Sequence, residues 1–315
     1  MTPSTCSLAS RLVFIAFCFG ALTAHAGERV ALLIANQNYN PKNEAGRWSQ
    51  LQNPANDVRE IGIRLKKLGW TVMPSDSSGK PAIDLSKAEM VERITQLVTY
   101  ANARNAAQIL VYYSGHGQEW QKGSYLIGVD ARNADQRETL VKGLQLQDLV
   151  SILSDYHGLK AIFVDACRTA PSKGSSGGLP NPNVTRDDLI FVYAAKANHS
   201  ADDWSDNNTG LFAHAFSRAL DTPFAEPHLL QLVQTTEKLM LATGKVQVPD
   251  MFSTTTNILT QYWFGTPRAG IVGHLARDDA DTPRKPGLAQ RRTLPEPEWG
   301  GAIKPSASDL LPLRK

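Results

Sequence analysis

Two short motifs contain residues that could do chemistry together, Tyr112-Tyr113-Ser114-Gly115-His116-Gly117 and Asp165-Ala166-Cys167-Arg168. His116 and Cys167 are 51 positions apart in the sequence. A cysteine becomes a strong nucleophile when a nearby base removes its proton, and an imidazole is the usual base. The two motifs therefore predict nucleophilic catalysis by Cys167, with His116 as the base that activates it.

Each motif follows a short apolar run, at Gln108–Tyr113 before the histidine and at Lys160–Val164 before the cysteine. Runs of this length, rich in Val, Ile, Phe and Tyr, are typical of buried parallel strands. In open α/β sheets, ligands bind beyond the carboxyl ends of the strands. We therefore expect both side chains at the edge of the sheet where such folds place their active sites.

Hydrolysis of an amide also needs donors for the oxyanion that develops on the carbonyl. Gly117 has no side chain, so its backbone N–H can approach a bound carbonyl closely. The backbone N–H of Cys167 is the natural second donor. No third member of a triad follows from the sequence, so we expect a His116/Cys167 dyad of the kind found in cysteine peptidases.

The chain contains three cysteines, Cys6, Cys18 and Cys167. The first two lie in residues 1–26, where an apolar stretch from Leu12 to Leu22 precedes a small-residue site that ends at Ala26. This is the layout of a secretory signal peptide cleaved near Ala26. We expect an exported protein, periplasmic or secreted, whose one remaining thiol is Cys167. A lone cysteine is often a buried packing residue, and the histidine motif favours the reactive alternative.

Composition and spacing disfavour nucleic-acid binding, membrane spanning and metal binding. The net charge of +3 is mild, and no basic stripe with interleaved aromatic residues indicates nucleic-acid binding. The apolar stretch of the predicted signal peptide, residues 1–26, is too short to span a membrane. We expect no transmembrane span in the mature chain. The histidines outside the motif show no metal-ligand spacing, and there is no EF-hand-like loop. We therefore expect no required cofactor or metal; calcium dependence and oligomeric state stay open.

Alternation of strands and helices predicts an α/β fold with one mostly parallel sheet and helices on both faces. Besides the two apolar runs, strands are expected at Arg29–Ala35, Trp70–Met73, Leu189–Ala194 and Ile258–Phe264, and a hairpin or edge strand at Ser124–Val129. Helices are expected from Asn53 to Leu68, Ser86 to Asn105, Leu146–Leu153, Leu211–Leu220 and Leu229–Ala242.

These patterns divide the chain into three segments. A folded domain at 27–265 lies between the leader 1–26 and a tail at 266–315, which has seven prolines and no sustained period and is expected to be disordered. Inside the domain, residues 169–186 are rich in Gly, Ser and Pro and predict a flexible loop. This loop contains Lys173 and Arg186, two basic sites at which the chain could be cleaved.

The chain resembles the caspase-like clan of cysteine peptidases, and within it the bacterial metacaspase or orthocaspase group of caspase homologues. The resemblance covers roughly Arg29 to Phe264. It rests on the two catalytic motifs and on ALLIANQNY, LQNPANDVREIGIRLKKLGW, YAAKANHSADD and GKVQVPDMFS, at residues 31–39, 51–70, 193–203 and 244–253. The resemblance implies a caspase-like fold with a mostly parallel six-stranded sheet whose last strand is reversed. It also implies a His/Cys dyad at the carboxyl edge and peptide or protein substrates.

Asp165 suggests the class of substrate. It stands two residues before Cys167, where animal caspases carry a glutamine. A carboxylate at the floor of a pocket favours a cationic P1 side chain and disfavours an anionic one. The resemblance implies the same preference for Arg or Lys, together with a second acidic residue for which Asp202 is favoured over Asp203. The sequence therefore predicts a cysteine endopeptidase that cleaves after Arg or Lys.

Two other functional hypotheses stay open. A caspase-like fold with weak or no activity could serve as a binding or scaffold module, although the presence of both His116 and Cys167 counts against it. A cysteine hydrolase or acyltransferase that does not act on peptides would use the same dyad chemistry. A thiol-directed probe with Arg at P1 distinguishes the endopeptidase from the binding module.

Overall fold

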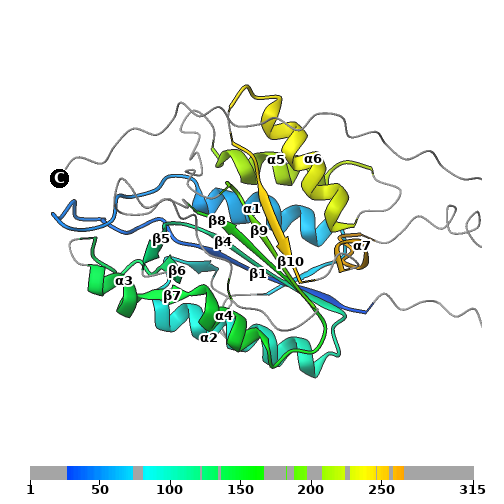
Figure 1. Cartoon of the computed structure of the whole chain (residues 1–315), viewed down its shortest axis with the longest axis horizontal. Helices are drawn as coiled ribbons and strands as arrows, with labels where there is room; N and C mark the ends of the chain where they lie inside the picture. Colours follow the sequence, from blue (N-terminus) through cyan, green and yellow to red (C-terminus); the bar gives the residue numbers. More distant parts are fainter. Residues whose placement is uncertain are drawn as a thin grey trace, which may run out of the picture. The chain divides into compact units, whose positions relative to one another are not determined.

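The computed structural model describes residues 27–73, 81–120, 123–133, 136–166, 182, 188–196, 208–223, 228–245, 247–254 and 258–265 (Figure 1). The predicted leader 1–26, the tail 266–315 and the loop 169–186, apart from Pro182, lie outside these residues. No helix among the residues described is long and apolar enough to cross a membrane.

One mostly parallel sheet forms the centre of this domain. Its strands are β1 (Arg29–Ala35), β2 (Thr71–Val72), β3 (Ala82–Ile83), β4 (Gln108–Ser114), β8 (Leu159–Asp165), β9 (Leu189–Tyr193) and β10 (Asp250–Ser253). They follow the order β10-β9-β8-β4-β1-β2. Strand β3 pairs with the second half of β1 and β2 with the first half, so both occupy one edge position. The expected mostly parallel sheet with a reversed last strand, β10, is therefore confirmed, and its seven strands occupy six positions.

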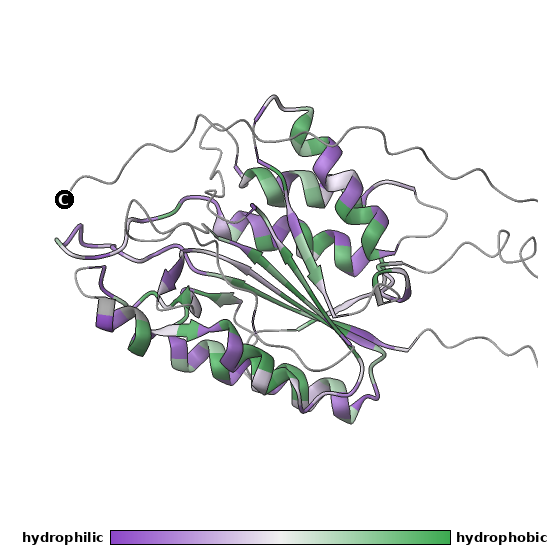
Figure 2. Cartoon of the chain, viewed as in Figure 1, coloured by the Kyte–Doolittle hydropathy of each residue, from purple (hydrophilic) through white to green (hydrophobic). Residues whose placement is uncertain are grey.

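The central strands are continuous apolar runs because both faces of the sheet are covered. Every residue of β1 and β4 is buried. Helices α1 (Pro54–Lys67), α5 (Leu211–Leu220) and α6 (Leu229–Leu241) share a hydrophobic core with one face. Helices α2 (Lys87–Ala103) and α4 (Leu146–Leu153) share another with the opposite face. Figure 2 shows the strands as largely hydrophobic and the helices as mixed, as expected for helices with one buried side.

A second, smaller sheet follows directly after His116. It consists of the antiparallel strands β5 (Gly117–Trp120), β6 (Gly123–Ile127) and β7 (Gly143–Gln145), with α3 (Gln136–Lys142) between the last two. The hairpin or edge strand expected at Ser124–Val129 corresponds to β6, which pairs with β5 on one side and β7 on the other. Strands β3, β5, β7 and β10 and helix α3 were not predicted, because two to seven residues are too few for a periodic pattern.

The strand predicted at Ile258–Phe264 is wrong. Residues Ile258–Gln261 form the short helix α7, and the aromatic residues that follow it are buried. Tyr262 donates a hydrogen bond to the carbonyl oxygen of Ile109 at 2.6 Å, and the indole N–H of Trp70 donates to that of Phe264 at 2.9 Å. The alternating apolar residues therefore pack against the start of the sheet instead of extending it, and β10 is its last strand.

Asn36 connects three segments at the carboxyl end of β1. Its side chain is fully buried. The amide nitrogen lies 2.9 Å from the carbonyl oxygen of Leu85 and 3.0 Å from that of Ile127, and the amide oxygen accepts the N–H of Leu85 at 2.9 Å. The backbone after β3 and the end of β6 are thereby joined to β1, beside the loop that contains His116.

We expect Asn36→Leu to lower the free energy of unfolding by about 3 kcal/mol, because each buried polar group left without a partner costs roughly 1–3 kcal/mol. Urea denaturation monitored by circular dichroism measures the change. Asn102→Ala is the matched control, since it removes one exposed hydrogen bond to the carbonyl oxygen of Asp155. Equal stability of the two variants would contradict the role of Asn36.

Candidate active site

His116 lies in the tight connection between β4 and β5, at the carboxyl edge of the main sheet. Strands β4 and β8 pair in parallel over seven residues, ending at Ser114 opposite Asp165. The N–H of Gly115 then donates to the carbonyl oxygen of Asp165 at 3.2 Å. The two motifs predicted to act together are therefore joined by backbone hydrogen bonds up to the residue before His116. Cys167 itself lies outside the described residues.

The imidazole of His116 is held by the loop that follows β1. Its Nε2 lies 2.8 Å from the carbonyl oxygen of Ser49 and 3.3 Å from the hydroxyl of the same residue. The ring of Tyr39 lies 4.6 Å away between centroids and the ring of Trp48 lies 5.0 Å away. Two aromatic rings and one backbone carbonyl thus fix both the position and the direction of the imidazole.

The contact with Ser49 indicates which ring nitrogen carries the proton and which can accept one. A carbonyl oxygen only accepts hydrogen bonds, so Nε2 carries the proton and Nδ1 is the acceptor in the neutral ring. Burial lowers the pKa of His116 from its ordinary value, while the hydrogen bond to Ser49 opposes this shift. A neutral imidazole near pH 7 whose Nδ1 can accept a proton is what a base for a thiol requires.

Ser49 was not identified from the sequence, where a dyad without a third member was expected. Its contribution comes from a backbone carbonyl, which any residue type possesses, so no residue pattern could reveal it. The loop is anchored on both sides of Ser49. The N–H of Leu51 donates to the carbonyl oxygen of Gln37 at 3.1 Å, and the N–H of Asn133 donates to that of Gly46 at 2.8 Å.

Gly117, the predicted oxyanion donor, begins β5. The N–H of Ile127 donates to the carbonyl oxygen of His116 at 3.0 Å. The next pair of residues along the ladder is Gly117 and Leu126. Hydrogen-bonded and non-hydrogen-bonded pairs alternate in an antiparallel ladder. The N–H of Gly117 therefore points away from β6, which leaves it outside the ladder and suits the predicted role.

Asp165, the predicted specificity residue, is the last residue of β8 and is 9% exposed. Its Oδ2 accepts a hydrogen bond from the hydroxyl of Tyr112 at 2.8 Å. The pKa of Tyr112 is raised well above its ordinary value, first by burial and then by the charges of Asp165 and Asp57. The phenol therefore stays protonated and acts as the donor to the Asp165 carboxylate.

A second buried carboxylate, Asp57, lies on the same face of the sheet. It accepts the hydroxyl of Ser114 at 2.8 Å through Oδ2 and the N–H of Gly210 at 2.8 Å through Oδ1. The sequence interpretation missed Asp57, although a signal was present. Asp57 lies four residues before Ile61 on the buried stripe of α1, and a carboxylate on an apolar stripe is unusual.

Asp202, the other predicted specificity residue, lies outside the described residues, as does Asp203. In the part of the chain that the structure describes, no group of His, Cys, Asp and Glu could hold a metal ion.

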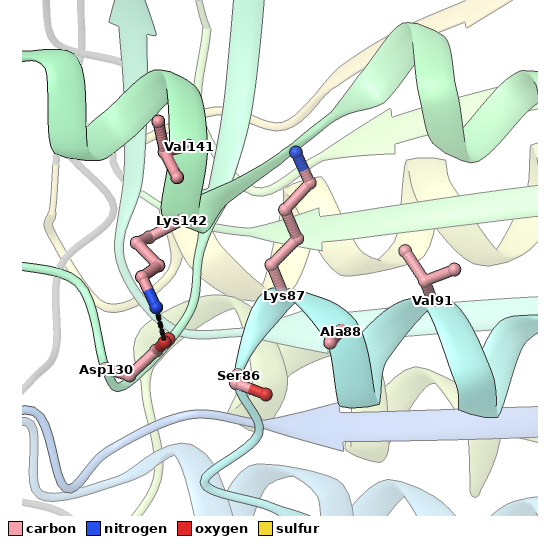
Figure 3. Close-up of a pocket in the computed structure, with 7 residues that line it drawn as sticks. All are labelled: Ser86, Lys87, Ala88, Val91, Asp130, Val141 and Lys142. Atoms are coloured by element: carbon pink, nitrogen blue, oxygen red, sulfur yellow. Dashed lines mark hydrogen bonds and ion pairs between the residues drawn. The ribbon is translucent and has the colours of Figure 1, made fainter.

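A surface pocket of about 440 Å³ lies at the start of α2 (Figure 3). Val91 and Val141 contribute apolar walls, and Lys142 forms an ion pair with Asp130 at 2.7 Å. The pocket shares no residue with the surroundings of His116, Asp57 or Asp165. The pocket therefore lies apart from the residues that the sequence predicts to act in catalysis.

Comparison with known proteins identifies the family. The family model described as "Caspase domain" matches residues 28–260. The chain belongs to the caspase domain family. It is 30% identical over 172 residues to mucosa-associated lymphoid tissue lymphoma translocation protein 1 of Homo sapiens, and 29% identical over 172 residues to the Mus musculus homolog. Each match covers 54% of this chain but 18% of the relative, so the chain spans less than a fifth of the length of these relatives.

The fold of this chain is also similar to that of a solved caspase structure. The crystal structure of caspase-1 from Spodoptera frugiperda superposes with a TM-score of 0.51 at 16% sequence identity, covering 78% of this chain and 92% of that one. The caspase-like fold and the assignment to a family of cysteine-type peptidases, both expected from the motifs, are thus confirmed. The narrower assignment to the bacterial metacaspase group stays a prediction.

We expect His116 to titrate below about 6.5, the ordinary value for histidine, because burial disfavours its charged form. The test is a pH titration of imidazole resonances by NMR in a Cys167→Ala variant, which removes coupling to the thiol. Comparison with a Cys167→Ala/His116→Gln double variant assigns the resonance among the seven histidines. A pKa at or above 6.5 would show that the ring is more solvated than its surroundings indicate.

Proposed function

We propose that this chain is an endopeptidase that hydrolyses peptide bonds after Arg or Lys, with Cys167 as nucleophile and His116 as base. The observation that carries the proposal is the pair of buried carboxylates, Asp57 and Asp165, at the edge of the sheet where His116 lies. We further propose that the protein acts after export, once residues 1–26 have been removed.

The chemistry follows from the state of His116. Its Nδ1 takes the proton of the Cys167 thiol, and the thiolate attacks the carbonyl carbon of the scissile bond. The N–H groups of Gly117 and Cys167 stabilise the oxyanion. As the C–N bond breaks, Nδ1 returns the proton to the leaving amine, and an acyl-enzyme is left. Water then attacks the thioester with the same imidazole as base, releasing the acid and restoring the thiol.

The two carboxylates account for the proposed P1 preference. Side chains at alternate positions of β4, Tyr112 and Ser114, orient Asp165 and Asp57 on one face of the sheet. Hydrogen bonds from hydroxyl and amide donors orient these carboxylates without themselves neutralising the charge. A guanidinium has five N–H donors and can bond two carboxylates at once, so two carboxylates in one pocket suit Arg especially well. Asp202 stays a proposed third acidic residue of this pocket.

We expect the purified protein to cleave fluorogenic peptides with Arg or Lys at P1 and to leave those with Asp at P1 intact. Cys167→Ala and His116→Ala should both abolish cleavage, because each removes one half of the proton-transfer pair. Assays with calcium and with a chelator determine whether the ion is required. Cleavage after Asp would overturn the assignment of the pocket. A folded, reduced protein that neither cleaves nor reacts with a P1-Arg acyloxymethyl ketone would instead be a binding module.

We expect Asp165→Asn and Asp57→Asn each to lower kcat/KM for P1-Arg peptides by about two orders of magnitude, since losing one partner of a buried charge pair costs roughly 2–5 kcal/mol. Asp221→Asn is the matched control, because this carboxylate pairs with Arg64 on the surface. If Asp57→Asn behaves like the control while Asp165→Asn does not, the pocket contains Asp165 without Asp57.

A further inference from the structure

Two buried tyrosines from different segments meet beneath the backbone of His116. Tyr39 belongs to the loop after β1, and Tyr113 is the penultimate residue of β4. Both side chains are fully buried, and their hydroxyl oxygens lie 3.1 Å apart. Neither residue has a role in the proton transfers described above, yet burying two phenols beside each other is costly unless both are well bonded.

The two hydroxyls bond both ends of the His116 backbone unit. The N–H of His116 donates to the Tyr39 hydroxyl at 2.9 Å, and the Tyr113 hydroxyl donates to the carbonyl oxygen of His116 at 2.8 Å. Gly115 is required for this approach, because a Cβ at that position would lie 2.6 Å from the Tyr113 hydroxyl and 2.8 Å from that of Tyr39. Contacts this short do not occur between unstrained atoms.

The carbonyl held by Tyr113 belongs to the same peptide unit as the N–H of Gly117. In a planar trans peptide the C=O and N–H bonds point in opposite directions. Because Tyr113 and the N–H of Ile127 both bond the carbonyl oxygen of His116, they turn the N–H of Gly117 away from themselves and from β6. A hydrogen bond to the carbonyl also polarises the peptide and strengthens its N–H as a donor.

We propose that Tyr39 and Tyr113 are positioning residues that set the orientation of the peptide between His116 and Gly117 and thereby prepare the Gly117 N–H as the oxyanion donor. Tyr113 acts directly on the carbonyl of this peptide. Tyr39 acts from the preceding side, through the N–H of His116. The inference rests on the proposed function, in which Gly117 stabilises the oxyanion.

Burial raises the pKa of both phenols far above their ordinary value. Both hydroxyls therefore keep their protons throughout the pH range in which His116 titrates, and Tyr113 remains a donor.

The test compares Tyr113→Phe with Tyr156→Phe. The control also removes a buried phenol that donates to a backbone carbonyl, that of Ala106 at 2.6 Å, but beside the amino end of β4. For Tyr113→Phe we expect kcat on a P1-Arg peptide to fall by about tenfold or more, less than the roughly 10²–10³ that loss of a donor costs, with KM within about twofold of wild type. Inhibition by a P1-Arg aldehyde, which also forms an oxyanion, should weaken by a similar factor.

Alkylation of Cys167 by iodoacetamide forms no oxyanion, so its rate should stay within about twofold of wild type. If it falls as much as kcat, the phenol acts on the thiol–imidazole pair and the proposal is overturned. Unchanged kcat and aldehyde inhibition relative to Tyr156→Phe would overturn it as well. If Tyr113→Phe does not fold, Tyr39→Phe provides the test. It should lower kcat and weaken aldehyde inhibition while leaving the alkylation rate unchanged.

A readout without turnover separates this inference from the proposed function. The amide resonance of Gly117 in ¹⁵N–¹H spectra should shift in Tyr113→Phe and stay in place in Tyr156→Phe. If the wild-type protein cleaves no peptide, the proposed function fails, and the Gly117 resonance still decides whether Tyr113 orients that peptide. An unmoved resonance would overturn the positioning role whatever the activity.

Discussion

The parallel pairing of β4 with its two neighbours is the constraint on which the site depends. Seven residue pairs join β4 to β1 and seven join it to β8, so the ends of all three strands stay level at one edge of the sheet. Alternate side chains of β4 then point to opposite faces. Tyr112 and Ser114 bond the carboxylates on the α1 and α5 face, whereas Tyr113 packs in the core with α2 and bonds the backbone of His116. A shift of one residue would exchange these two sets of contacts.

Hydrogen bonding at the carboxyl edge explains how so many polar groups remain buried there. The carbonyl oxygen of Ile127 lies within hydrogen-bond distance of Asn36, Tyr39 and Tyr113, and the backbone of His116 is bonded by the same two tyrosines. Such a network specifies one geometry, because moving any member leaves a buried group without a partner. The apolar middle of the sheet contributes stability, while this polar end determines where the imidazole lies.

Much of the fold was predictable because its central elements have strong patterns. The apolar runs of β1, β4 and β8 and the helical spacing in α1 and α2 placed these elements within a few residues. The segment from Ile258 to Phe264 was misassigned because its alternating apolar residues pack as individual aromatic anchors. Within the site, His116, Gly117 and Asp165 follow from the motifs. The carbonyl of Ser49 and the carboxylate of Asp57 depend on tertiary contacts, which local spacing does not encode.

The buried carboxylates differ from the remainder of the polar network because they carry charge. A neutral hydroxyl or amide is satisfied once its hydrogen bonds are made, but an ionised carboxylate retains a desolvation cost that neutral donors offset only in part. Asp57 additionally bonds the N–H of Gly210, the N-cap residue of α5, where a helix favours negative charge. The fold thus stabilises the charge of Asp57 from β4 and from α5 at once. In the function proposed here, the negative charge held at this edge of the sheet is what would favour a basic side chain of the substrate.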